Sequence, residues 1–207
     1  MYSIKEIYKT IQGEGAHSGR SAVFVRFSGC NLWSGKEKHR KSAICNFCDT
    51  DFVGTDGING GKYSKEALLK KIYELWDSDT EGFIVFTGGE PMLQLDKELI
   101  KFCKAKGFIT AIETNGTIDI DFDIDWVCVS PKAGSELLVK KGNELKVVYP
   151  QPEFDLKYFE KLGFDHFFLQ PMDSKDIKEN TTNAIQYCLK NPLWKLSIQQ
   201  HKILGID

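Results

Sequence analysis

Short runs of β-branched and aromatic residues recur along the chain, and polar or glycine-rich stretches separate them. Runs of this length and composition predict buried strands. The predicted strands are 22–28, 83–87, 109–114, 125–130, 145–149 and 166–170. An N-terminal strand, whose limits the pattern does not set, precedes them, and the tail over 194–203 is predicted to be extended.

Apolar residues recur at helical spacing between several of these runs. Ser64 stands where a helix N-cap belongs, and Ala67, Leu68, Ile72 and Leu75 follow on one helical face. Further helices are predicted around 95–106, 155–162 and 175–189. Apolar strands separated by helices indicate an α/β fold with a mainly parallel sheet covered by helices. About six strands are too few for an eight-stranded barrel, so we predict one domain, 1–207, built as a partial, open TIM-like barrel.

Distinctive short motifs follow the predicted strands. They are SGC, TGGEP, ETNG, SPKAG and QPMD, in chain order. Ligands of parallel sheets bind at the carboxyl ends of the strands. One such motif would mean only a turn, but five of them at one edge predict a single large binding site.

Composition narrows the class of protein. The chain has 207 residues, with 27 Lys and Arg against 29 Asp and Glu and a net charge of −2. This balance argues against a protein that holds nucleic acid by bulk charge. No apolar run approaches the roughly 20 residues that span a bilayer, and the start of the chain lacks a signal-peptide core. We therefore expect a cytoplasmic protein, without a membrane or direct nucleic-acid partner.

Six cysteines in such a chain favour metal or reactive chemistry over disulfides. Cys30, Cys45 and Cys48 form the pattern C-x14-C-x2-C, which leaves three interpretations open. A structural zinc site could take His39 as its fourth ligand, and Cys45 with Cys48 could be a redox pair. Three thiolates could also hold a cubane iron–sulfur cluster with one iron left open. The other three cysteines lie among apolar neighbours and are interpreted as core residues, namely Cys103, Cys128 and Cys188.

The residues around the last two cysteines favour the cluster. The segment Cys45-Asn46-Phe47-Cys48, together with SGC and TGGEP, resembles the radical S-adenosylmethionine (SAM) superfamily. The usual first spacing of three is expanded here to fourteen. That spacing, with IQGEG, CDT, TGGEPMLQLD, ETNG, SPKAG, QPMD and the final HKILGID, resembles the 7-carboxy-7-deazaguanine synthases over nearly the whole chain.

The resemblance implies a radical SAM domain with a cluster-binding loop at about 30–50, and a lyase of queuosine and 7-deazapurine biosynthesis. A [4Fe-4S] cluster on Cys30, Cys45 and Cys48 would bind SAM at its open iron. A 5′-deoxyadenosyl radical would then take hydrogen from 6-carboxy-5,6,7,8-tetrahydropterin, whose ring contracts to 7-carboxy-7-deazaguanine with loss of ammonia.

Further site residues follow from the same resemblance. Those expected at SAM are Phe47, Cys48, Asp49, Gly89, Ser130, Pro131, Lys132, Gln170, Pro171, Met172 and Asp173. Those expected at the substrate are Ile11, Gln12, Gly13, Glu14, Arg26, Thr87 and Asp207. Arg26 would grip the substrate carboxylate, although strand alternation alone also allows it to face outward. Thr50 would bind Mg²⁺, while Asp207 could equally be a frayed end.

The expected partners are an electron donor such as flavodoxin or ferredoxin and a second copy of the chain, because a cofactor-binding open barrel of this size often forms a homodimer. Glu113 and Asn115 are expected to supply supporting hydrogen bonds, and the basic run KEKHRK to be a solvated loop. Two alternative functions stay open at this point. One is an activase that places a radical on a glycine of another protein, and the other is a zinc-dependent binding module.

Overall fold

The computed structural model describes residues 1–206, in which nine strands form one sheet. The strand order is β3-β1-β2-β4-β5-β6-β7-β8-β9. From β2 to β9 neighbouring strands are parallel, whereas β1 is antiparallel to both β2 and β3. The limits are β1 (Tyr2–Ile11), β2 (Ser21–Phe27), β3 (Gly61–Tyr63), β4 (Gly82–Gly88), β5 (Phe108–Thr114), β6 (Trp126–Val129), β7 (Lys141–Tyr149), β8 (Gly163–Pro171) and β9 (Trp194–Leu196).

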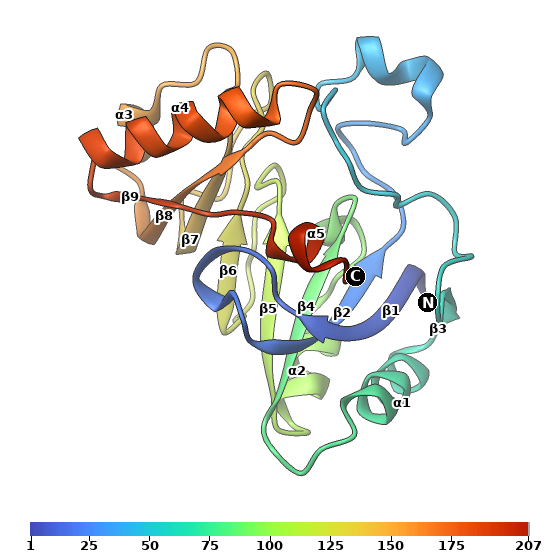
Figure 1. Cartoon of the computed structure of the whole chain (residues 1–207). Coiled ribbons are helices and arrows are strands. Elements are labelled where there is room, and N and C mark those ends of the chain that lie inside the picture. Colours follow the sequence, from blue (N-terminus) through green and yellow to red (C-terminus); the bar gives the residue numbers. More distant parts are fainter. Residues whose placement is uncertain (207) are drawn as a thin grey trace.

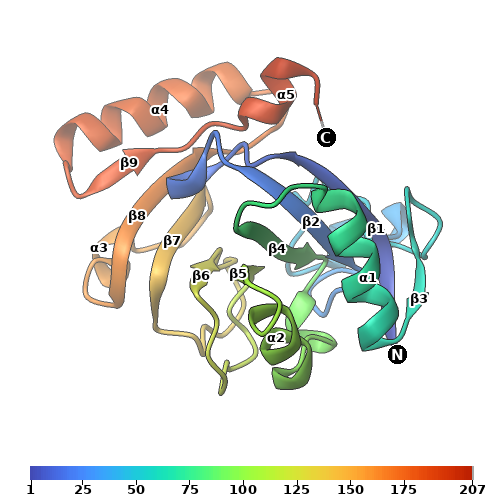
Figure 2. The ribbon, with the colours of Figure 1, turned by 90° about the horizontal axis from the view of Figure 1, so that it is seen from below.

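The sheet curves into an open barrel (Figures 1 and 2). The helices are α1 (Lys65–Trp76), α2 (Lys97–Lys104), α3 (Leu156–Phe159), α4 (Ile177–Lys190) and α5 (Gln200–Leu204). Among residues 1–206 no helix has the length and apolar composition needed to cross a membrane. The parallel strand order and the curvature of the sheet confirm the expected open, mainly parallel barrel. Strands additional to the six predicted ones lie at both edges of the sheet.

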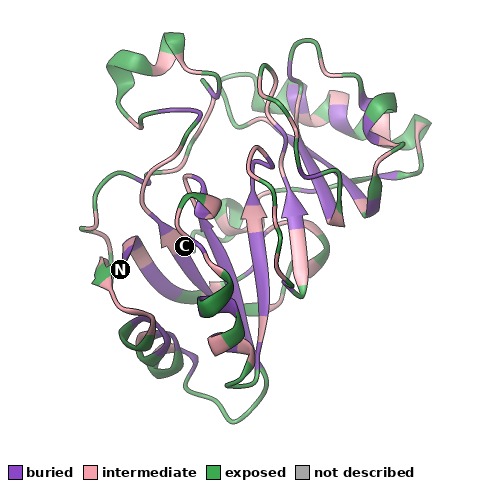
Figure 3. Ribbon diagram, turned by 180° about the vertical axis from the view of Figure 1, so that it is seen from behind, coloured by how far each residue is buried: buried purple, intermediate pink, exposed green. Residues whose placement is uncertain are grey.

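Strand alternation divides the side chains between a helix-covered core and the barrel interior. Val23, Val25 and Ile84 are fully buried in the core that α1 and α2 cover. Phe24, next to Val23 in β2, belongs to a separate cluster on the other face of the sheet. Figure 3 shows strands that are mostly buried, with exposure concentrated on helices and loops. Arg26 is two residues after Phe24 in β2, so its side chain lies on the same face of the strand and points into the barrel.

Helix limits agree with the sequence at the strongest amphipathic segments. The Ser64 hydroxyl accepts a hydrogen bond from Ala67 N at 3.2 Å, so the expected cap of α1 is confirmed. The helix predicted at 155–162 is limited to the four residues of α3.

The extended tail predicted over 194–203 is wrong in its second half, where α5 forms. This helix of five residues is too short to show a periodic pattern. Its first amide, from Gln200, donates to Gly13 O at 3.0 Å. Gly205 ends the helix in a left-handed conformation with φ of 66°.

Candidate active site

The carboxyl ends of the parallel strands surround a cavity of about 460 Å³. Its lining includes the predicted site residues of the N-terminal loop, the cysteine loop and the ends of β4, β6 and β8. Two predicted residues are exceptions. Pro131 is buried and does not line the cavity, and its carbonyl accepts from Gln151 Nε2 at 3.5 Å. Asp207 lies outside the described residues. The expected clustering of strand-end motifs at one edge is thus observed.

Three thiols share this cavity. Cys30, Cys45 and Cys48 all line it, and no other cysteine of residues 1–206 does so. The Cys45 thiol donates a hydrogen bond that lowers the pKa of Cys48 to about 6. The same interaction raises the pKa of Cys45, and burial adds to that rise. At least one thiolate is therefore readily available as a metal ligand near neutral pH.

The zinc alternative required His39 as a fourth ligand. Instead, its Nδ1 shares a hydrogen bond of 2.8 Å with the Ser34 hydroxyl in an exposed part of the loop. Within residues 1–206 no group of three or more His, Cys, Asp or Glu side chains is arranged to hold a single metal ion. A cubane cluster binds each thiolate at a separate iron, so its ligands need not converge on one point.

The second glycine of the TGGEP motif, Gly89, lies against the backbone of Gly29 and the side chain of Cys30. A Cβ placed on Gly89 would lie 2.2 Å from Gly29 O and 2.8 Å from Cys30 Cβ. Only a glycine lets the ends of β2 and β4 approach this closely. The motif therefore brings bare backbone to the cavity beside the thiol of Cys30.

Lys132 adds a partly buried cation to the cysteine side. Its Nζ donates to Ser130 O at 2.6 Å and to Ser130 Oγ at 2.7 Å. Burial lowers the pKa of this ammonium, while the neighbouring Cys45 and Cys48 favour its charged form. A cation at this position can neutralise thiolates or receive a ligand carboxylate.

Glu90, the acidic residue of TGGEP, joins two strand ends from within the core. Its side chain is fully buried and accepts three hydrogen bonds, from Met92 N at 2.9 Å, Thr114 Oγ1 at 2.7 Å and Asn115 N at 2.7 Å. Burial raises the pKa of the carboxyl, and the two backbone donors oppose that rise. Its role in this structure is to fix the edge of the cavity.

We expect Glu90→Ala to lower the free energy of unfolding by about 3 kcal/mol or more, because it leaves three donors unpaired, two of them buried. Urea unfolding measures this difference. Glu81→Ala, at an exposed glutamate just before β4, is the matched control, with an expected change below about 0.5 kcal/mol. Equal stability of the two variants would contradict the role assigned to Glu90.

The N-terminal loop brings amide and carboxylate groups to the cavity. Gln12 Nε2 donates to Glu113 Oε1 at 3.0 Å. The Glu14 carboxylate accepts from Gln170 Nε2 at 3.0 Å, from Gln199 Nε2 at 3.1 Å and from the Lys146 ammonium. These contacts join the loop to β5, β7 and β8, so the IQGEG motif is held by several strands at once.

Lys146, on β7, is the charged centre of this network. Its side chain is 5% exposed, and it pairs with Glu14 and, at 3.5 Å, with Glu113 Oε1. Burial favours the neutral amine, but the surrounding carboxylates raise the pKa of Lys146 well above its ordinary value. Likewise, burial opposes ionisation of Glu14, but Lys146 lowers the pKa of that carboxyl.

Arg26 faces inward, as one of its two interpretations required, and already has protein partners. Its Nε donates to Glu6 Oε1 at 2.8 Å and its Nη2 to Tyr8 Oη at 3.1 Å. Both partners belong to β1, and all three residues line the cavity. Thr50 also lines it, and its Oγ1 lies 3.5 Å from Asp49 Oδ1.

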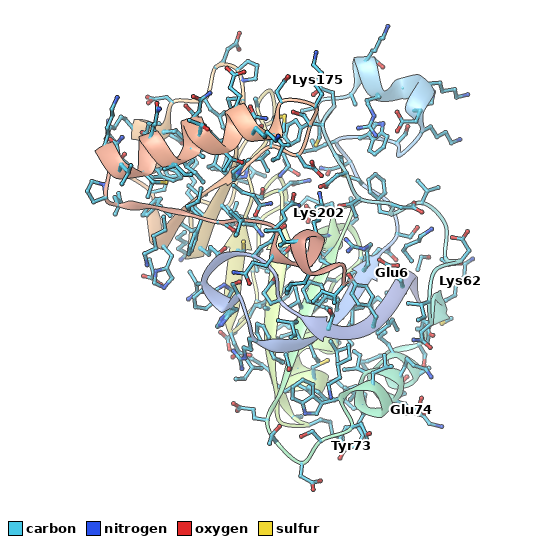
Figure 4. All side chains as sticks on the ribbon, viewed as in Figure 1. Glu6, Lys62, Tyr73, Glu74, Lys175 and Lys202 are labelled. Carbon is cyan, nitrogen blue, oxygen red and sulfur yellow. The ribbon has the colours of Figure 1, made fainter. Side chains whose placement is uncertain are left out.

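The C-terminal segment covers part of the cavity. Lys202 on α5, labelled in Figure 4, donates to Asp49 Oδ2 at 2.5 Å and to Asp173 Oδ2 at 2.6 Å. A Cβ on Gly13 would lie 2.5 Å from His201 Nδ1. The glycine of IQGEG therefore makes room for α5.

Several cavity residues were absent from the predicted set. Lys146 carried a usable signal, because a lysine inside the apolar run of β7 needs a buried partner. The expected supporting hydrogen bonds of Asn115 are observed, to Asn31 and Thr117. Most of the other missed charged or polar residues come from β1 and the C-terminal segment, and they include Lys5, Glu6, Tyr8, Gln199, His201 and Lys202.

Comparison with known proteins places the chain in a family. The model of the radical SAM superfamily matches residues 40–191. A 7-carboxy-7-deazaguanine synthase of Bradyrhizobium diazoefficiens is 54% identical, with 99% of each chain covered. One of Bacteroides thetaiotaomicron is 37% identical over 100% of this chain and 99% of its own. The crystal structure of QueE from Escherichia coli superposes with a TM-score of 0.71 at 26% identity, covering 96% of this chain and 93% of that one.

The superfamily implies a [4Fe-4S] cluster and SAM as cofactors, and the residues present fit them. Three soft thiolate donors line the cavity without a fourth cysteine from residues 1–206, and this set suits a cluster that keeps one iron open. Bare glycine backbone and the Lys132 cation stand beside them, where a zwitterionic amino acid can bind. The chain is therefore an enzyme of the radical SAM superfamily, and it belongs to the 7-carboxy-7-deazaguanine synthases.

Proposed function

We propose that the enzyme converts 6-carboxy-5,6,7,8-tetrahydropterin into 7-carboxy-7-deazaguanine with loss of ammonia, in queuosine and 7-deazapurine biosynthesis. The supporting observation is one cavity that holds three thiols together with an inward guanidinium and an ionised carboxylate. The cluster and SAM, when bound, supply the one-electron chemistry that removes a hydrogen atom from the substrate. Neither the glycyl-radical activase nor the zinc module has support of this kind.

The cysteine side of the cavity is proposed to bind SAM. Phe47 would provide an apolar contact beside Cys48, and the bare backbone of Gly89 would allow close approach. Ser130 and Lys132 would offer a hydroxyl and a cation to ribose and carboxylate groups. Gln170, Pro171, Met172 and Asp173 would border the adenine, with Asp49 opposite them across the Lys202 contact.

The N-terminal side is proposed to bind the pterin. Arg26 would exchange part of its contact with Glu6 for a bidentate grip on the substrate carboxylate. Glu14 would accept hydrogen bonds from the guanidine-like edge of the pterin, which requires one of its glutamine partners to move aside. Ile11, Gln12, Gly13 and Thr87 would complete the pocket.

Thr50 is proposed to bind Mg²⁺ together with substrate oxygens and water, which would complete an octahedral shell. Asp51 follows directly, and its Oδ2 lies 2.8 Å from Lys5 Nζ, so the segment after the cluster loop is tied to β1. A divalent ion bound at Thr50 would therefore lie beside a segment that this ion pair holds in place.

The electron donor is proposed to be a small redox protein such as a flavodoxin or ferredoxin, and the cytoplasm the place of reaction. A homodimer is also proposed. Exposed apolar side chains on α5, Ile203 and Leu204, provide surface that a second copy could cover.

The test is anaerobic turnover by protein reconstituted with iron and sulfide. Incubation with the carboxytetrahydropterin, SAM, Mg²⁺ and a reductant should give 7-carboxy-7-deazaguanine and ammonia in equal amounts, measured by mass spectrometry and an ammonia assay. Tetrahydropterin without the 6-carboxylate is the matched control, and it should not react. Absence of the deazaguanine product with the full substrate would refute the proposal.

A further inference from the structure

The fourteen residues between Cys30 and Cys45 form a folded unit, although their basic sequence predicts a solvated loop. A short 3₁₀ helix, Glu37–Ser42, stands away from the sheet at the upper right of Figure 1. Most of its residues are exposed as expected, but Arg40 is only partly exposed. Its side chain turns back toward the cysteine segment.

Arg40 contacts that segment through its backbone. Its Nη1 donates to Asn46 O at 3.1 Å and to Cys48 O at 3.0 Å. Glu37 holds the other side of the guanidinium, accepting from Nε at 2.8 Å and from Nη2 at 2.5 Å. This two-point contact fixes the plane of the guanidinium and directs Nη1 at the two carbonyls.

Trp33 supports the guanidinium from below. Arg40 Cζ lies 4.0 Å from the centre of the Trp33 ring, and the ring packs edge-on against Phe52 at 5.5 Å. Trp33 is buried although its Nε1 has no hydrogen-bond partner within residues 1–206. Burying an unpaired N–H costs free energy, and the cation–π contact with Arg40 offsets part of that cost.

The insertion also reaches the first cysteine. Leu32 N donates to Cys30 Sγ at 3.4 Å, and Cys45 N donates to Leu32 O at 3.3 Å. The residues between the cysteines therefore contact all three ligand positions, with Arg40 the only one of them that brings a positive charge to the Cys48 carbonyl.

We propose that Arg40 is a positioning residue of the cluster site, which fixes the Cys45–Cys48 segment and makes reduction of the bound cluster easier. The inference rests on the proposed cluster ligands. The proposal gives the expanded spacing between Cys30 and Cys45 a structural purpose, because this insertion supplies the Arg40 side chain that holds the carbonyls of Asn46 and Cys48. The guanidinium lies between the Glu37 carboxylate and the Cys48 carbonyl, so its positive charge faces the cysteine segment and favours the reduced, more negative form of the cluster. Groups around metal ligands also commonly change metal retention.

Three variants test the proposal. Arg40→Met removes the charge and the hydrogen bonds to both carbonyls, Arg40→Lys keeps the charge without the planar fork, and Lys41→Met removes a charge from an exposed residue of the same 3₁₀ helix. The measurements are iron released to a chelator, the reduction potential of the reconstituted cluster, and thermal unfolding of the cluster-free protein. None of these requires turnover.

Arg40→Met should lose iron about 10–100-fold faster than the unchanged enzyme and should have a more negative potential. Arg40→Lys should recover most of the potential and only part of the iron retention, and Lys41→Met should match the unchanged enzyme in both. Cluster-free Arg40→Met should still unfold in one cooperative transition, with a midpoint lowered only by the loss of the contacts to Trp33 and the two carbonyls, which separates the effect from misfolding.

Iron retention and potential in Arg40→Met equal to those of Lys41→Met would overturn the inference, as would failure of the unchanged protein to bind a cluster. The outcome is independent of the proposed reaction. An enzyme without deazaguanine product could still show the Arg40 effect, and an active enzyme could lack it.

Discussion

Replacing Lys146 with Met is expected to lower the free energy of unfolding by about 3–5 kcal/mol at pH 7, as breaking a buried ion pair does. The ammonium is nearly inaccessible and contacts Glu14 and Glu113. Its removal leaves the carboxylates of Glu14 and Glu113 without their cation at the cavity, where burial already opposes ionisation of Glu14. Unfolding in urea measures the loss. Lys141→Met, at the exposed start of the same strand, should change stability by less than about 0.5 kcal/mol.

The effect of Lys146→Met should depend on pH with a definite sign. The folded pKa of Glu14 lies below its ordinary 4.5, so its contribution is full above that pH and is lost as the pH falls through the folded pKa. The folded pKa of Lys146 lies above its ordinary 10.5, so its contribution is full below that pH and is lost as the pH rises further. Groups facing the pair are Glu113, Glu144, Cys128 and His201.

The difference between the unchanged protein and Lys146→Met should therefore be full below about pH 10.5, and it should shrink as the pH falls from the pKa that buried Glu14 has without Lys146 toward its pKa in the unchanged protein, which lies below 4.5. A variant within about 1 kcal/mol of the unchanged protein across pH 6–8 would mean that these carboxyls are neutral in the fold. The ionised Glu14 proposed as a pterin acceptor would then lose its basis.

The parallel strands and the cysteine triad could be predicted from the sequence because both leave local signals. Apolar runs such as Phe83–Thr87 are visible without their neighbours, and the motifs that follow them must meet at one edge of a parallel sheet. Arg26 inside an apolar strand likewise predicted an inward charge, and its side chain lines the cavity.

The features that the sequence did not predict, namely the limits of β1, the helix α5 and the contacts of Arg40, depend on interactions between residues far apart in the chain or hidden within a polar run. In β1 the register shifts between Ile4 and Glu6, so a bulge interrupts the alternation that would have set the strand's limits. The helix α5 is placed by Gly13, nearly the whole chain away. Arg40 stands in a run of exposed charges, and only folding shows that Trp33 and two carbonyls lie beneath it.

The cysteines should divide sharply into two groups. Serine at Cys30, Cys45 or Cys48 is expected to reduce bound iron from about four per chain to near zero, because a hydroxyl is a poor replacement for a thiolate and no other cysteine among the described residues lines the cavity. Turnover should fall below detection in each variant. Iron and sulfide analysis of the reconstituted proteins, with their visible absorption, measures the loss.

Cys103 and Cys188 provide the matched controls for these variants. Cys103 on α2 is fully buried against the core, so Cys103→Ala should cost about 1–2 kcal/mol of stability through lost packing while keeping its iron. Cys188→Ser, on the partly exposed side of α4, should keep both iron and stability. This contrast separates loss of the cluster from loss of the fold. Iron that persisted in Cys30→Ser but disappeared in Cys103→Ala would mean that the ligand set, and with it the open iron on which SAM binding depends, is assigned to the wrong residues.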